Sequence, residues 1–260
     1  MSPDLALRHM PDVLNFKYGA PGRRGWTPRL HKLFGYSSPD DWYEATLFHL
    51  IGPDTDWLDV GCGRHVFPNN QQGARHLAAT CRVLVGVDPS DNIHQNQIVH
   101  ERAQCMLQDY RTDRRFDLVT MRRVAEHIED AAAAVAALSR LIRPGGLAVI
   151  YTVDKFSPVS RVAAATPMPV HHFAKRVLWG GAQEDTFPVV YRMNTRRDLC
   201  SLFRQGGFRE ESFTYLDDCR TLSQWILSAF AELALWKMLR AAGLRYPEGC
   251  LLGLYRMTAD

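Results

Sequence analysis

The chain has 260 residues, of which 46% are hydrophobic and 23% are charged, and its formal net charge is +3 at pH 7. This composition is typical of a globular protein that buries a sizeable core without disulfides or a structural metal. The small net charge does not favour a nucleic-acid partner. No run of about 18 apolar residues occurs, which argues against a membrane span.

The cysteine pattern indicates free thiols. No two cysteines have the C-x-x-C spacing of a zinc or redox site, and the N-terminus does not resemble a secretion signal. We therefore expect a reducing, cytoplasmic location. The six cysteines are Cys62, Cys81, Cys105, Cys200, Cys219 and Cys250. The oligomeric state stays open.

In chain order, residues 1–53 contain turn signals around a basic, aromatic stretch. Apolar residues at helical spacing predict a helix from Trp42 to Ile51, with Asp40 or Asp41 as its N-cap. The pattern then changes to short apolar runs separated by helical stretches. Strands are predicted at residues 57–60, 83–88, 104–107, 116–121 and 147–153, and helices at a polar stretch that ends near residue 80 and at residues 131–142, before a Pro-Gly-Gly stop.

After residue 153 the regular alternation ends. Residues 154–195 are irregular, and a helix at 196–205, a strand at 208–216, one or two helices at 221–242 and a strand at 250–257 follow. Within 221–242, Trp225, Phe230, Leu233 and Trp236 recur at helical spacing, which favours core packing. Strands that alternate with helices predict an α/β fold. We expect a Rossmann-like, doubly wound, mostly parallel sheet with helices on both faces and inserted lid segments after the fifth and sixth strands.

Two motifs stand at the ends of the first two predicted strands. Gly61-x-Gly63 provides a turn in which the backbone can approach a ligand closely, because glycine lacks a Cβ and tolerates positive φ. Asp88 ends the next strand, where its carboxylate can accept hydrogen bonds from two ribose hydroxyls. In an open parallel sheet, ligands bind at this edge. Position 66 is a valine, so the third glycine of the dinucleotide-binding fingerprint is missing.

Further runs follow these motifs in a consistent order between residues 57 and 153. They are Leu58-Asp-Val-Gly-Cys-Gly63, Val85-Gly-Val-Asp88-Pro-Ser, Gln108-Asp109 followed by Phe116-Asp-Leu-Val, Val124-Ala-Glu-His-Ile128 and Leu141-Ile-Arg-Pro-Gly-Gly146. Together they resemble the motifs of class I S-adenosylmethionine-dependent methyltransferases. The last run has no role in a dinucleotide oxidoreductase, the neighbouring family.

The resemblance implies S-adenosylmethionine as the cofactor. It implies that Gly61 and Gly63 line the methionine part, with Cys62 in backbone contact, and that Asp88 holds the ribose. The adenine would contact Asp109 and the Tyr110 amide, although Asp109 can also be read as a surface turn residue. The remaining residues in the expected cofactor site are Pro89, the backbone of Met121 and Arg122, and Asp59, which supports the loop from behind.

The resemblance also implies methyl transfer to an O or N atom of a small-molecule acceptor, as in specialised-metabolite or sugar biosynthesis. The domain would comprise an N-terminal helical cap (1–53), a cofactor-binding core (54–153) and acceptor-side insertions (154–195 and 217–248). The insertions are rich in aromatic residues, as expected of a small-molecule pocket. A cofactor-binding regulatory subunit, or a same-fold enzyme that catalyses another reaction of S-adenosylmethionine, stays an alternative.

Three histidines are candidate catalytic residues, because an alcohol or phenol acceptor needs a base. His127 follows the fourth strand and is either a base or a structural residue. His171 and His172 lie in the irregular segment and either face the pocket or form a solvated loop pair. His65 is expected to order the glycine loop.

No metal site is expected. Some quinone-pathway relatives build a magnesium site from a glutamate three residues before the glutamate-histidine pair. This chain has Arg123 at that position, and its positive charge would repel a metal from the neighbouring residues Glu126, His127, Glu129 and Asp130.

Overall fold

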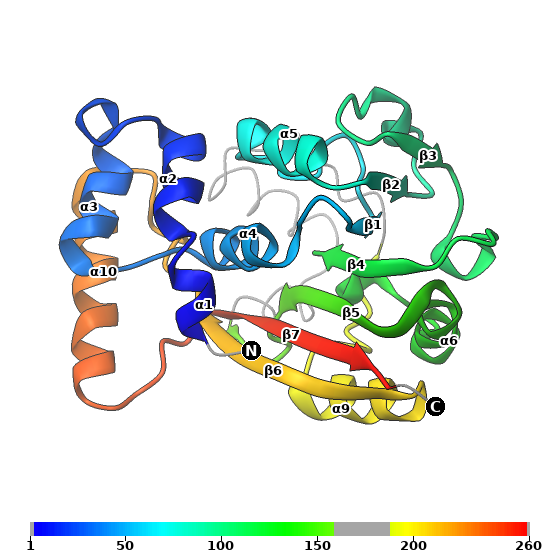
Figure 1. Cartoon of the computed structure of the whole chain (residues 1–260). Helices are drawn as coiled ribbons and strands as arrows, with labels where there is room; N and C mark the ends of the chain where they lie inside the picture. The colour runs from blue at the N-terminus through cyan, green and yellow to red at the C-terminus, as the bar shows by residue number, and fades with distance from the viewer. Residues whose placement is uncertain (1–2, 159–187, 259–260) are drawn as a thin grey trace.

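The computed structural model describes residues 3–158 and 188–258, which form a seven-stranded sheet with helices packed against it (Figure 1). The strand order is β3-β2-β1-β4-β5-β7-β6. The strands are β1 (Asp56–Val60), β2 (Val83–Val87), β3 (Glu101–Ala103), β4 (Phe116–Arg122), β5 (Ile142–Val153), β6 (Phe208–Asp217) and β7 (Gly249–Met257). The α-helices are α1 (Pro3–Leu7), α2 (Met10–Tyr18), α3 (Trp26–Phe34), α4 (Pro39–Leu50), α5 (Gln71–Thr80), α6 (Ala131–Leu141), α9 (Arg196–Gln205) and α10 (Ile226–Ala241).

The sheet is parallel from β3 to β5, and β7 is antiparallel to both of its neighbours, β5 and β6. The chain builds outward from β1 to β3 and then crosses to β4 on the other side of β1. The edge where the strand order reverses is therefore at the carboxyl ends of β1 and β4, the usual ligand site of such sheets. The predicted mostly parallel α/β sheet is confirmed.

Two apolar clusters cover the two faces of the sheet. Trp57 packs in the cluster that contains α4 and α5, whereas Leu58 and Val60 pack in the cluster that contains α6 and α9. Successive side chains of a strand point to opposite faces, so β1 is buried on both sides. This explains why three of its five residues, Trp57, Leu58 and Val60, are apolar and why they do not alternate with polar ones along the whole strand.

The N-cap of α4 differs from the predicted one. Ser38 caps the helix by accepting a hydrogen bond from the amide of Asp41, and the Asp41 carboxylate accepts the Ser38 amide in return at 2.9 Å. The reciprocal bonds make a capping box and place Pro39 at the first helical position, where its missing N–H costs nothing. The expected caps, Asp40 and Asp41, lie inside the first turn instead.

The third strand was also placed wrongly. β3 occupies Glu101–Ala103 and pairs with Val85–Val87, whereas residues 104–107 lead into a 3-10 turn, η3 (Leu107–Asp109). β3 is a short edge strand whose Glu101 and Arg102 are exposed, so it carries no apolar pattern that a sequence reading could detect. β5 starts earlier than predicted, at Ile142, because Ile142 already pairs with Phe116 of β4. The Arg-Pro-Gly-Gly run lies in an irregularity between this pair and the next one, Leu147 with Leu118.

A third cluster joins α3 and α10, which lie side by side at the left of Figure 1. Leu233 and Trp236 of α10 are buried in this cluster, as expected. Trp225 and Phe230 are not core residues, because they are 72% and 49% exposed. In the described part of the chain, no helix has the length and apolar character that crossing a membrane requires.

Candidate cofactor and acceptor site

The glycine loop after β1 needs glycine at its first position. Gly61 has φ 72° and Gly63 has φ 44°, both in the left-handed region. A Cβ on Gly61 would also collide with the side chain of Val124, which comes from the loop after β4. The Gly61 amide donates to the Val87 carbonyl at 2.7 Å and so continues the β1–β2 ladder. The loop is therefore held tightly against both neighbouring strand ends.

Asp88 faces this loop from the end of β2. Its Oδ2 accepts the Gly63 amide at 2.9 Å and its Oδ1 accepts the Ser90 amide at 2.8 Å. Burial raises the pKa of Asp88, while the two amides act in the opposite direction. Each carboxylate oxygen has received one donor and keeps a lone pair for another. These free acceptor positions fit the two hydroxyl donors of a ligand diol such as the ribose of S-adenosylmethionine.

The residues expected at the adenine lie next along the same edge, because β3 pairs with β2. Asp109 ends η3 and is exposed, and Tyr110 is half-buried. The Tyr110 amide donates to the carbonyls of Met106 and Leu107 at 3.2 and 3.3 Å, so it closes the turn. Pro89 is half-buried directly after Asp88. Contact of these residues with adenine stays a prediction.

Asp59 lies behind the loop, across the boundary between β1 and β4. It accepts a hydrogen bond from the Thr120 hydroxyl at 2.6 Å, and the Trp57 indole donates to the same hydroxyl at 2.8 Å. Burial raises the pKa of Asp59 to about 7, against the opposing effects of Thr120 and Arg122. The carboxylate therefore joins the two strands that frame the site.

Asn96 supports the loop from the other side and was missed in the sequence. Its side-chain amide donates to the carbonyls of Cys62 and Gly63 at 3.4 and 3.2 Å. Cys62 itself is buried, and burial raises the pKa of its thiol well above the ordinary value. No motif surrounds Asn96, so only the fold brings it to the loop.

At the end of β4, Met121 is fully buried and its side chain belongs to the core. Its backbone pairs with Val60 and Ile150 on the two neighbouring strands. Arg122 ends the strand and donates to Asp40 of α4 at 2.9 Å. Contact of the backbone of these two residues with the cofactor stays a prediction.

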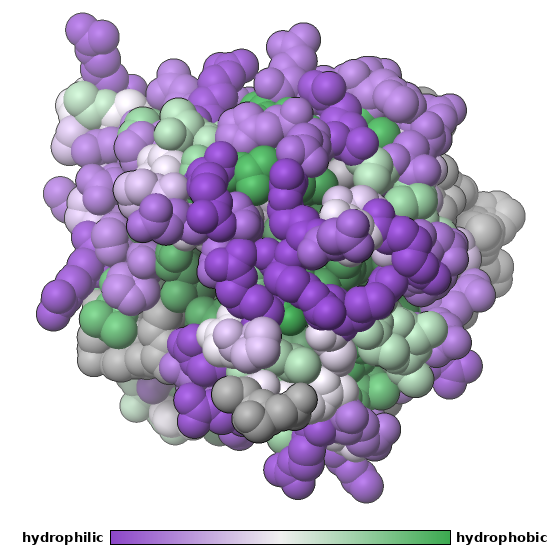
Figure 2. Space-filling model, turned by 45° about the vertical axis from the view of Figure 1, so that its right-hand side comes forward, coloured by the Kyte–Doolittle hydropathy of each residue, from purple (hydrophilic) through white to green (hydrophobic). Residues whose placement is uncertain are grey.

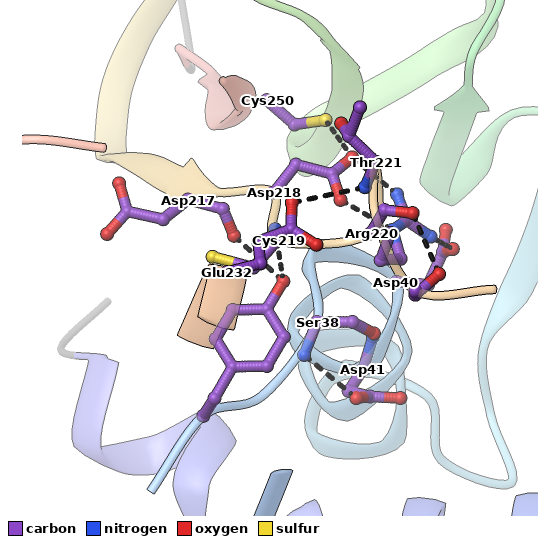
Figure 3. Close-up of polar contacts among 12 residues, drawn as sticks. Ser38, Asp40, Asp41, Asp217, Asp218, Cys219, Arg220, Thr221, Glu232 and Cys250 are labelled. Carbon is purple, nitrogen blue, oxygen red and sulfur yellow. Dashed lines mark hydrogen bonds and ion pairs between the residues drawn. The ribbon is translucent and has the colours of Figure 1, made fainter. Parts of the chain in front are cut away.

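Asp40 is the centre of a polar network at this edge of the sheet (Figure 3). Its carboxylate is paired with Arg122 and with Arg220, and Arg220 also binds Asp218 through two bonds of 2.5 and 2.7 Å. Burial alone would raise the pKa of Asp40, but the two guanidinium groups hold it well below its ordinary value. The network joins α4, β4 and the β6–α10 connection. The sequence offered one sign of this network, the charged run Asp217-Asp-Cys-Arg220 at the end of β6, because a strand pattern does not account for its three charged residues.

The glutamate-histidine pair lies in the 3-10 turn η4 (Ala125–His127). Glu126 is buried, accepts the Thr152 hydroxyl at 2.7 Å and lies 3.4 Å from Arg123, whose φ of 58° is unusual for a non-glycine residue. His127 places Nδ1 at 3.1 Å from the Pro188 carbonyl oxygen. Among residues 3–158 and 188–258, no three histidine, cysteine or acidic side chains are grouped as metal ligands.

The irregular segment leaves and rejoins the sheet at one point. The Lys155 amide donates to the Asn194 carbonyl at 3.1 Å, and the Asn194 side chain donates to the Thr152 hydroxyl at 2.7 Å. The Val190 amide donates to the Glu126 carbonyl at 2.8 Å. Both ends of the segment therefore lie beside η4. His171 and His172 lie outside the described residues.

Comparison with known proteins agrees with this geometry. A family model described as a methyltransferase domain matches residues 22–212. A ubiquinone biosynthesis O-methyltransferase of Rhodopseudomonas palustris is 32% identical over 109 residues, 38% of this chain and 39% of the relative. One from Alkalilimnicola ehrlichii is 31% identical over 167 residues, 58% of this chain and 64% of the relative. The chain thus spans less than two thirds of either relative.

A solved structure shares the fold. The N-methyltransferase NodS from Bradyrhizobium japonicum, in complex with S-adenosyl-L-homocysteine, superposes with a TM-score of 0.51 at 16% identity. The superposition covers 98% of this chain and all of NodS. The family match spans well over half of the chain. The chain therefore belongs to the methyltransferase domain family, the class I enzymes whose methyl donor is S-adenosylmethionine.

Proposed function

We propose that the chain transfers a methyl group from S-adenosylmethionine to an oxygen atom of a small-molecule acceptor, with His127 as the base. The cofactor supplies the activated methyl group on its sulfonium. The protein then has to hold donor and acceptor in line and, for a hydroxyl acceptor, remove a proton. The O-methyltransferase relatives support an oxygen acceptor, although the chain spans only part of them.

The cofactor half of the site uses backbone and one carboxylate. In the proposal, Gly61 and Gly63 let the methionine part approach the loop, and Asp88 accepts the ribose hydroxyls with its free lone pairs. Asp59 and Asn96 hold the loop from behind. Asp109 at the end of η3 would accept the adenine amino group.

The hydrogen bond of His127 carries the assignment of the base. A carbonyl oxygen only accepts, so the Nδ1 that faces Pro188 bears the proton of the neutral ring. The other ring nitrogen, Nε2, is then unprotonated and can accept a proton from an acceptor hydroxyl. A nitrogen acceptor would need no such base. This arrangement therefore favours oxygen over nitrogen.

The acceptor side would come from residues 154–195 and 217–248. Both ends of the first segment meet beside η4, and the start of the second is joined to Asp40 through Arg220. Both segments are thus anchored at the edge that carries the glycine loop. The small-molecule acceptor would bind between them and the cofactor.

The experiment is methyl transfer from labelled S-adenosylmethionine to a panel of phenols, catechols, sugars and amines. We expect transfer to hydroxyl acceptors. His127→Gln should lower kcat for hydroxyl acceptors without changing affinity for S-adenosyl-L-homocysteine. The control is His76→Gln, an exposed histidine on α5.

Two outcomes contradict the proposal. Transfer to amines alone would exclude an oxygen acceptor. An unchanged kcat in His127→Gln would assign His127 a structural role, as the anchor of residue 188.

A further inference from the structure

The outward face of α10 is apolar. Leu227, Ala231, Leu235 and Met238 recur at helical spacing on one face, and Leu227 and Met238 are 82% and 68% exposed. The opposite face packs on α3 through the third cluster. A surface helix normally turns polar residues to water, and a helix that is apolar all round is normally covered. The outward face of α10 therefore lacks the character of a solvated surface.

Exposed apolar side chains concentrate at this place. We call residues 19–35 and 219–247 the α3–α10 unit. It holds ten of the fifteen exposed large hydrophobic side chains of the described chain, including Trp26, Leu33 and Trp225. Figure 2 brings the right-hand side of Figure 1 forward, away from α3 and α10, and the face that it shows is mostly hydrophilic with apolar surface only in scattered places. A contiguous exposed apolar area of this kind marks a binding surface.

Positive charge concentrates in the same unit. It carries eight lysine and arginine residues and one acidic residue, whereas the rest of the chain carries 23 and 27. The single acid, Glu232, is buried and accepts the amides of Thr221 and Leu222. The small net charge of the whole chain thus hides a strongly cationic unit on an otherwise acidic protein. One of the eight cations, Arg220, is paired with Asp40 and Asp218 outside the unit, and the other seven have no acidic side chain of the unit at the surface beside them.

A shallow groove combines the two features. It has a volume of about 470 Å³ and lies between the start of α3 and the start of α10. Trp26, Leu33 and Ile226 supply apolar walls, and Arg24 and Arg29 stand in its lining. Apolar walls beside guanidinium groups suit a ligand with an acyl part and an anionic head.

We propose that the α3–α10 unit docks on an anionic lipid surface. The outward face of α10 would enter the interface between headgroups and acyl chains, while the surrounding lysine and arginine side chains bind headgroup phosphates. Exposed tryptophans such as Trp225 suit the same depth, because the indole is apolar with one polar atom. The proposal is independent of methyl transfer and of the acceptor.

Charge decides between a lipid surface and a second copy of the chain. A two-fold dimer through α10 would bring the same face of both copies together. The exposed cations of the two units, such as Lys237 and Arg245, would then oppose each other, which disfavours this contact. Nucleic acid would satisfy the charge, but it would leave the apolar row from Leu227 to Met238 uncovered. An anionic lipid surface satisfies both features.

The test is flotation of the full-length protein with vesicles of phosphatidylcholine alone and of an equimolar mixture with phosphatidylglycerol. We expect binding to the anionic vesicles and much less at high salt, which screens the charges. Leu227→Gln/Met238→Gln and Lys237→Glu/Arg245→Glu should each weaken this binding by about tenfold or more. The controls are Phe156→Gln and Arg209→Glu, exposed residues outside the unit, which should bind as wild type.

All four positions are exposed, so the variants should keep the wild-type melting temperature. Sedimentation of the same proteins without lipid measures self-association, and fluorescent DNA and RNA fragments measure binding to nucleic acid. The proposal is overturned if wild type ignores both vesicles or binds them equally, or if the controls lose binding as much as the variants. It is also overturned if the α10 variants abolish a dimer or nucleic-acid binding while vesicle binding is absent.

Discussion

Replacing Asp88 with alanine should weaken binding of S-adenosyl-L-homocysteine by about 2–4 kcal/mol, or about 30- to 700-fold. The carboxylate would lose two charge-assisted hydrogen bonds to the ribose, each contributing about 1.5–3 kcal/mol with incomplete additivity. The same change removes the partners of the Gly63 and Ser90 amides. Leaving each amide unsatisfied costs about 1–3 kcal/mol when no water replaces the carboxylate.

Asp88→Asn separates these two effects. The asparagine keeps one carbonyl oxygen, which can accept one of the two amides, but it has no charge and its other polar atom donates. We expect a loss of affinity close to that of alanine and a smaller loss of thermal stability. Calorimetry with S-adenosyl-L-homocysteine and thermal unfolding without ligand measure the two quantities on the same protein.

Asp91→Ala is the matched control, because Asp91 is an exposed acid three residues away in the 3-10 turn η2 (Asp91–Gln95). It should bind as wild type. If folded Asp88→Ala keeps the wild-type Kd, the ribose is held elsewhere and the cofactor assignment of the loop is wrong. If Asp91→Ala loses as much affinity, the effect of Asp88 is general electrostatics and not a contact.

Three further changes test other parts of the site. Gly61→Ala should lower stability by about 1–3 kcal/mol and abolish cofactor binding, and an undiminished melting temperature would contradict the described loop. Adding Val124→Ala to this variant should restore part of the stability, because it removes the collision with the new Cβ but leaves the positive φ. Burial raises the pKa of Asp59 to about 7, so its contribution to stability is fully present at low pH and is lost as the pH rises from about 4 to 7. Denaturation measured across that range should show a fall in unfolding free energy that is flatter in Asp59→Asn. Arg220→Gln should lower stability by about 2–4 kcal/mol, because the buried Asp40 then keeps only Arg122 as its ion-pair partner. The control Arg196→Gln removes an exposed ion pair with Glu210 and should change the melting temperature little.

The sequence predicted the parts of the site that depend on local chemistry. A glycine turn after an apolar run and an aspartate after the next run are recognisable in one dimension, since the two runs are neighbouring parallel strands. The helix at 196–205 was also predicted with the observed bounds, because a threonine cap precedes it and a glycine pair follows it.

The sequence did not predict the parts that only the fold brings together. Asp40 and Arg220 are 180 residues apart, and their pairing depends on how α4 and the β6–α10 connection meet. Asn96 has no motif, and β3 is too short and too polar to show a strand pattern. The sequence pattern placed Trp225 and Phe230 in the core together with Leu233 and Trp236, because apolar residues recur at helical spacing whether their face packs on protein or stays exposed.

The hydrogen bond between Lys155 and Asn194 shows that the chain leaves the end of β5 and returns to it at one place. A piece of chain that starts and ends at the same place can vary in length at a small entropic cost, about 0.6 kcal/mol for each doubling, without moving the sheet. The glycine loop, Asp88 and β4 therefore do not depend on what is inserted there. If the acceptor is bound as proposed, exchanging this one segment would change what is methylated, while the half that holds the donor stays as it is.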